Sequence, residues 1–195
     1  MSKNETYQTV TRLGRFDAAH RVLHQASRCK SYHGHGFQYE LTFGFNNLSK
    51  IGGSYAIDFS EIKRVGCQWI DDHLDHGSIL NPQDKLSRHI IEDSTNKVWF
   101  MSLYGQDIFC NPTVENISKE IFLAMELLMQ DEESGLHIQK VKIFETPNCF
   151  TECTEFSISK DQRHNFCEAN AYEIEQYRRK LGEFEYDARK LTPYK

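Results

Sequence analysis

Five side chains that can bind a metal ion or carry a proton gather in one short stretch of this sequence. They are His20, His24, Cys29, His33 and His35. Alternate residues of a β-strand point to the same side, so the imidazoles of His33 and His35 can reach one ion. His20, at the end of a preceding strand, can supply a third nitrogen. Three histidines with a vacant fourth position are typical of a catalytic zinc site, although other borderline metals also fit.

This stretch has two possible interpretations, a metal site or a surface loop. An HxH pair is common, and the histidines can also be polar side chains of a surface loop. Cys29 lies four residues before His33, and a thiol beside a cation loses its proton readily, so that it can act as a base. The alternative for Cys29 is a buried, inert thiol. His24 is a neighbour of the group without an assigned role.

Further acid and base groups occur later in the chain. In Asp75-His76, the carboxylate can orient the imidazole and raise its basicity. The alternative is a pair of ordinary exposed residues at a helix end. Glu145 closes an expected strand, where a carboxylate could bind a planar pair of N–H groups, such as those of pterins and guanines.

Two strands must position the histidines. Residues 7–20 read as the first strand, and the clearest alternation in the chain marks residues 36–45 as the second. The residues expected on its buried side are Phe37, Tyr39, Leu41, Phe43 and Phe45. Extending that alternation backwards puts His33 and His35 on the same side as these residues.

Three helices are expected. The first begins near Asp58, where Asp58-x-x-Glu61 resembles a capping box, and runs to His73. The second follows Thr113 as its N-cap and carries apolar residues to Leu128. A charged, helix-prone tail starts at about residue 168. Its apolar positions recur at three and four residues: Ile174, Tyr177, Leu181 and Phe184.

The order of the elements indicates the fold class. Two more strands are expected over 138–144 and 150–158, and residues 83–110 form a mixed insertion without an assignment. The order β, β, α, α, β, β followed by a helical tail indicates an α+β fold with two helices on one face of an antiparallel sheet.

Composition excludes several classes of protein. The chain has 195 residues and a formal charge of −5, which suits one domain and argues against nucleic acid as the main partner. No apolar run is long enough to cross a membrane, and the start lacks the apolar core of a signal peptide. A cytoplasmic protein is therefore expected, with its six cysteines as thiols, ligands or core residues.

Several separated motifs occur together in the order typical of one family. They are Phe16-Asp17-Ala18-Ala19-His20-Arg21, Cys29-x-x-x-His33-Gly34-His35-Gly36-Phe37, Asp58 to Lys63, Leu74-Asp75-His76, Asn111 to Asn116, and Glu145-Thr146. On these motifs the chain resembles the 6-pyruvoyl-tetrahydropterin synthase family over about residues 7 to 160. The spacing of Cys29 and His33 is most similar to the branch of 6-carboxy-tetrahydropterin synthases.

The resemblance implies a structure and a site. The fold would be the T-fold (ββααββ), with a catalytic domain over 1–160 that contains the insertion at about 83–110, and a helical extension over 161–195. Subunits of the family assemble through their sheets into barrels, commonly as a hexamer of two trimers or a related T-fold barrel, with active sites between subunits. The implied roles are zinc ligands (His20, His33 and His35), a base (Cys29) with its assisting pair (Asp75 and His76), and pterin-binding residues (Glu145 and Thr146).

The resemblance also implies a reaction. This is the zinc-dependent conversion of 7,8-dihydroneopterin triphosphate to 6-carboxy-5,6,7,8-tetrahydropterin, acetaldehyde and triphosphate, a step of queuosine (7-deazaguanine) biosynthesis. Two alternatives stay open: a pterin lyase of the 6-pyruvoyl-tetrahydropterin synthase kind, and a zinc-binding paralogue with little catalysis.

The chain departs from the family pattern at four places. It has Gly77 where a second histidine often follows the Asp-His pair. Residues 81–111 are longer than usual, a glycine expected soon after Glu145-Thr146 is missing, and the tail beyond about 168 is additional. These departures indicate a diverged paralogue.

Overall fold

One six-stranded sheet forms the centre of the molecule. The computed structural model describes residues 8–45, 57–92, 95–130 and 135–182, and the strand order across its sheet is β4-β3-β1-β2-β5-β6. The strands are β1 (Gln8–His20), β2 (His33–Phe45), β3 (Gly77–Leu80), β4 (Val98–Phe100), β5 (His137–Thr146) and β6 (Cys149–Cys153). The four strands expected from the sequence, β1, β2, β5 and β6, pair antiparallel in that order.

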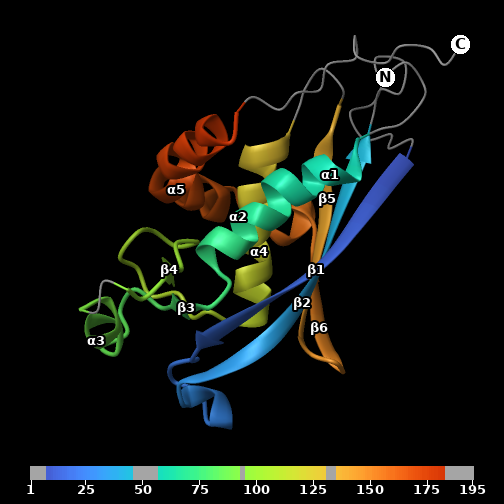
Figure 1. Ribbon diagram of the computed structural model, residues 1–195. Helices are drawn as coiled ribbons and strands as arrows, with labels where there is room; N and C mark the ends of the chain where they lie inside the picture. The colour runs from blue at the N-terminus through green and yellow to red at the C-terminus, as the bar shows by residue number, and fades with distance from the viewer. Residues whose placement is uncertain (1–7, 46–56, 93–94, 131–134, 183–195) are drawn as a thin grey trace, which may run out of the picture.

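Helices cover one face of this sheet (Figure 1). α1 (Phe59–Glu61), the π-helical segment η3 (Ile62–Cys67) and α2 (Gln68–His73) follow one another without a break after the cap residue Asp58. α4 (Val114–Met129) begins after Thr113, whose hydroxyl accepts a hydrogen bond from the Asn116 N–H. The apolar faces of these helices pack on the sheet and form the core. The expected α+β class, with two helices against the sheet, is confirmed.

The pairing of β1 with β2 decides where the histidines lie. Phe16 lies opposite Phe37 in the ladder, and their rings stack with centroids 5.0 Å apart. This register places Ala18 opposite His35 and His20 opposite His33. Because directly opposed residues share a sheet face, the three imidazoles project on the helix-covered side, as the alternation predicts.

The insertion extends the sheet. It contains α3 (Ser87–Ile91) and β4, while β3 lies just before it. β3 runs parallel to β1, and β4 runs parallel to β3, so the complete sheet is mixed. β3 has four residues and β4 has three. Strands this short show too few alternations for a periodicity to be visible in the sequence.

Two boundaries differ from the sequence prediction. β6 ends at Cys153, and the 3-10 turn η4 (Glu155–Ser157) follows it. The last helix, α5 (Lys160–Lys180), begins eight residues earlier than expected, because Ser159 and Gln162 form a reciprocal capping box. Of its expected apolar face, Ile174 is buried and Phe184 lies outside the described residues. In the described part of the chain, no helix combines the length and apolarity needed to span a bilayer.

A buried carboxylate joins the insertion to α4. Glu120 accepts hydrogen bonds from Trp99 Nε1 (2.5 Å) and from the backbone N–H of Leu103 (3.1 Å), and it also contacts Ser102. Asn170 of α5 donates to the Ser102 hydroxyl at 2.8 Å. Three separate segments are therefore connected through one polar network inside the core.

The Glu120 carboxyl should make stability depend on pH. Burial raises its pKa from 4.5 to about 7, against the opposing effect of its hydrogen bonds. Between these two values the folded chain holds the proton more tightly than the unfolded chain does. The free energy of unfolding should therefore fall by about 3 kcal/mol as pH rises through this window. Chemical denaturation of wild type and Glu120→Gln at pH 5 and pH 8 measures this difference. Identical pH dependence in the two proteins would contradict it.

Candidate metal centre

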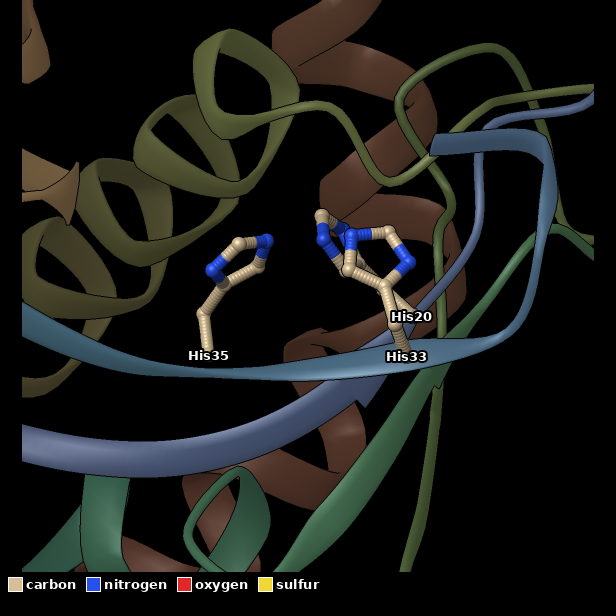
Figure 2. A group of neighbouring side chains, drawn as sticks. All are labelled: His20, His33 and His35. Atoms are coloured by element: carbon tan, nitrogen blue, oxygen red, sulfur yellow. The ribbon is translucent and has the colours of Figure 1, made fainter. Parts of the chain in front are cut away.

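Three imidazoles meet at the end of the β1–β2 pair. Figure 2 shows His33 and His35 on one strand and His20 on its neighbour, with all three rings on the same side. The ring centroids of His20 and His33 lie 4.8 Å apart, as do those of His33 and His35. One nitrogen from each ring lies within 4.8 Å of the others, so the three could hold one metal ion.

Hydrogen bonds to carbonyl groups set the tautomer of two of these rings. His20 Nδ1 lies 2.8 Å from the Pro112 carbonyl oxygen, and His33 Nδ1 lies 2.6 Å from that of Ser31. A carbonyl oxygen only accepts, so in each ring Nδ1 must carry the hydrogen. The lone pair is then on Nε2. Orientation of a ligand histidine by a carbonyl group is common in metal sites.

His20 is the most informative of the three. Its side chain is fully buried, and burial lowers its pKa below 6.5, with the Pro112 carbonyl and Glu145 opposing this effect. The ring is therefore neutral near pH 7. Its Nε2 has no hydrogen-bond partner among the described residues. A buried nitrogen in this state is costly unless something fills its coordination.

Glu145 faces this nitrogen. Its Oε1 lies 3.5 Å from His20 Nε2, a distance and geometry that give no hydrogen bond. With its proton on Nδ1, His20 cannot donate to the carboxylate, so a lone pair and a carboxylate oppose each other. Glu145 lies at a register irregularity between Phe144 and Thr146, where a bulge re-aims a side chain. A cation bound at His20 Nε2 would relieve this opposition of electron-rich groups.

A short polar motif fastens this end of the sheet to α4. The Asn111 side chain accepts from the Leu23 N–H (3.0 Å) and donates to the Leu23 carbonyl (2.9 Å). Pro112 then presents its carbonyl to His20, and Thr113 caps the helix. The sequence Asn111-Pro112-Thr113 thus orients a metal ligand while it starts a helix.

Asp75 and His76 form a hydrogen-bonded pair. His76 Nδ1 lies 2.6 Å from Asp75 Oδ2, and the Asp17 N–H donates to Asp75 Oδ1 at 2.7 Å. The His76 N–H in turn donates to the Asp17 carbonyl at 2.7 Å. Burial raises the pKa of the Asp75 carboxyl, but its hydrogen bonds with Asp17 and His76 and the charge of Lys97 outweigh burial, so the pKa is lowered overall. The carboxylate therefore stays ionised and keeps its partner oriented.

An open pocket of about 680 Å³ lies beside this pair. His76, Lys97, His35 and Gly34 are among the residues that line it. Within the described residues, however, no hydrogen bond, ion pair or ring contact joins the Asp75–His76 pair to the three imidazoles. One chain therefore brings together the histidines and Glu145, while the acid–base pair shares a pocket with His35 and, in the part of the chain that the structure describes, makes no hydrogen bond to the cluster.

Cys29 and Thr146 lie at the margins of the histidine cluster. Cys29 is half-buried in the 3-10 turn η1 (Arg28–Lys30), within the connection between β1 and β2, and its carbonyl accepts from the Val22 N–H at 2.8 Å. Its thiol makes no hydrogen bond within the described ranges. Thr146 is the last residue of β5, directly after Glu145. The structure places both residues near elements of the cluster without giving either a contact to it.

Two nearby arginines already form ion pairs. Arg21 Nε donates to the buried Asp84 at 2.6 Å, and a second guanidinium nitrogen also contacts that carboxylate. Arg15 contacts Asp17 at 3.3 Å in an exposed position. The Arg21–Asp84 pair therefore ties the turn before α3 to the end of β1. It also leaves fewer guanidinium donors of Arg21 free to bind an anionic ligand.

Sequence reasoning missed the groups that orient the site residues. Ser31 and Pro112 act through backbone carbonyls, and Asp17 acts through its backbone N–H and carbonyl. Any residue type can make such bonds, so no side-chain pattern identifies them. Lys97, within the insertion, acts through contacts with the Asp71 and Asp75 carbonyls, and only the structure shows these contacts.

Comparisons with known proteins agree with this architecture. A family model described as 6-pyruvoyl tetrahydropterin synthase matches residues 9–155. A curated protein of Rickettsia felis, named 6-carboxy-5,6,7,8-tetrahydropterin synthase, is 35% identical over 73% of this chain and 96% of its own length. A Haemophilus influenzae protein of the same name is 28% identical over 72% and 94% of the two chains.

Solved structures share the fold. An uncharacterized protein of Wolinella succinogenes superposes with a TM-score of 0.57 at 18% identity, over 76% of this chain and 98% of its own. The 6-pyruvoyl tetrahydropterin synthase of Caenorhabditis elegans has a TM-score of 0.50 at 20% identity, over 75% and 94% of the two chains.

Proposed function

Since this chain belongs to the 6-pyruvoyl tetrahydropterin synthase family, we propose that it carries out the reaction for which its curated relatives are named. The substrates would be 7,8-dihydroneopterin triphosphate and one molecule of water. The products would be 6-carboxy-5,6,7,8-tetrahydropterin, acetaldehyde and triphosphate, formed in queuosine biosynthesis in the cytoplasm. Residues 1–160 would form the catalytic unit and residues 161–195 its helical extension.

The histidine cluster carries this proposal. His20, His33 and His35 offer three nitrogens to one ion, and carbonyl groups aim Nε2 of both His20 and His33. Neutral imidazoles in a set of three suit Zn²⁺ with an open position. Bound there, zinc would act as a Lewis acid that polarises the hydroxyl groups of the substrate side chain.

The remaining groups would handle the ring and the protons. Glu145, with Thr146 beside it, would bind the N–H groups of the pterin through its carboxylate. The Cys29 thiolate would remove a proton from carbon, and His76 would move protons at oxygen. Asp75, hydrogen-bonded to His76, would hold that imidazole in one orientation.

Assembly would complete the site. Because no hydrogen bond joins the Asp75–His76 pair to the three histidines among the described residues of one chain, we infer that the pair serves the zinc of a neighbouring copy. A homo-oligomer built through the sheets, as a hexamer of two trimers, would place the two together. No nucleic acid and no membrane enters this scheme.

Product analysis tests the proposal. The zinc-loaded chain is incubated with dihydroneopterin triphosphate, and pterins and acetaldehyde are identified by chromatography and mass spectrometry. The proposal predicts acetaldehyde and carboxy-tetrahydropterin in equal amounts. A pyruvoyl product would instead identify the first alternative, another pterin lyase. Full zinc occupancy without turnover would identify a zinc-binding paralogue.

A further inference from the structure

The turn that presents His76 has a backbone that its surroundings must hold in place. His76 has a φ of 54°, in the left-handed region that residues with a side chain rarely adopt. Helix α2 also ends irregularly before it. The Asp75 N–H bonds to the carbonyl of Ile70 at 3.2 Å. In a regular α-helix it would bond to Asp71, four residues back.

Lys97 donates hydrogen bonds to two carbonyl groups at this irregular end of α2. Its Nζ donates to the Asp71 carbonyl at 2.7 Å and to the Asp75 carbonyl at 2.6 Å. A cation at the C-terminal end of a helix is favoured by the partial negative charge of the last carbonyls. One ammonium therefore ties the last turn of α2 to the first residue of the acid–base pair.

The backbone of Lys97 is itself fixed. The Ser78 N–H donates to the Lys97 carbonyl at 2.9 Å, beside the pairing of β3 with β4. Lys97 also lies close to Gly77. A Cβ there would lie 3.2 Å from the Lys97 carbonyl oxygen and 3.3 Å from its Cδ. Glycine at position 77 thus makes room for the lysine.

We propose that Lys97 is a positioning residue, through which the insertion at 83–110 holds the Asp75–His76 turn in its working conformation. The proposal rests on the assignment of His76 as a proton carrier in the proposed function. Two other contacts, between the backbone of Asp17 and the pair, fasten the turn to β1. Lys97 fastens the turn to α2.

A kinetic comparison tests this role. Lys97→Met keeps the side-chain stem and removes the ammonium, whereas Lys97→Arg keeps two donors for two carbonyls. Lys85→Met is the matched control, because Lys85 is an exposed lysine of the same insertion. In zinc-loaded full chain, Lys97→Met should lower kcat about 10- to 100-fold with KM almost unchanged, because proton transfer depends on small displacements. Lys97→Arg and Lys85→Met should stay within about threefold of wild type.

The opposite kinetic pattern would overturn the proposal. If Lys97→Met raised KM and left kcat unchanged, Lys97 would be a direct contact of the substrate, since it lines the pocket beside His76. A loss of kcat that Lys97→Arg does not restore would also reject the role as a bridge between two carbonyls.

Amide hydrogen exchange separates this inference from the proposed function. Measured without substrate, protection of the His76 N–H, which donates to the Asp17 carbonyl, should fall about tenfold or more in Lys97→Met. Lys85→Met should leave it unchanged. Unaltered protection in Lys97→Met would refute the positioning role even if the enzyme turns over. If wild type has no turnover, the proposed function fails and exchange still decides the role of Lys97.

Discussion

Cys29→Ala should lower turnover of dihydroneopterin triphosphate by about 10²- to 10⁴-fold, the range typical for loss of a general base. The substitution removes only the thiol. The Cys29 N–H can still donate to the Ser27 hydroxyl, and the carbonyl can still accept from Val22, so the turn that carries residue 29 should persist. Zinc content should be unchanged, because the three histidines supply the ligands.

Two measurements on the same samples check this prediction. Acetaldehyde release gives the rate, and elemental analysis gives zinc per chain. Cys149→Ala is the matched control, since Cys149 is an exposed thiol at the start of β6. Rates within about twofold of wild type for Cys29→Ala would remove the thiol from the reaction. A loss of zinc in Cys29→Ala would instead make that thiol a ligand.

His33→Ala should abolish metal retention. His33 supplies one of three nitrogens, and its removal leaves only those of His20 and His35 to hold the ion. Loss of a partner that merely orients a ligand costs about 10- to 100-fold in metal affinity, so loss of the ligand itself should exceed about 100-fold. Turnover should fall to background with the metal. The substitution should remove little buried surface from the folded chain, because the His33 side chain is only half-buried.

Dialysis followed by zinc analysis measures this effect, with His164→Ala as the control. His164 is an exposed histidine of α5, distant in sequence from the cluster. We expect that control to keep its zinc and its rate. Stoichiometric zinc in dialysed His33→Ala would show that the metal centre lies elsewhere.

The sequence predicts the histidine cluster because one periodicity governs both its core and its ligands. Alternation from Phe37 onwards defines the buried side of β2, and the same alternation extended to His33 and His35 gives the side on which they project. The order of elements predicts four antiparallel strands and two covering helices. Neither inference needs knowledge of contacts between distant residues.

The parts that sequence reasoning missed depend on such contacts. The partners that fix the tautomers are backbone carbonyls, which leave no mark in the residue types. β3 and β4 are too short to show a period, and their place depends on pairing, of β3 with the edge of β1 and of β4 with β3. In the sequence, nothing distinguishes Glu120 from other polar residues of a helix. In the structure it is buried and accepts hydrogen bonds from residues 99–103. The bulge that aims Glu145 likewise arises from the pairing with β6.

Zinc titration of the metal-free chain tests the central claim most directly. The metal is removed with a chelator, zinc is added back in measured equivalents, and acetaldehyde release from dihydroneopterin triphosphate is followed at each step. If His20, His33 and His35 form the catalytic centre, activity should rise linearly and stop rising at one zinc per chain. Activity that is complete before zinc is added, or that never appears when zinc is bound, would contradict the account.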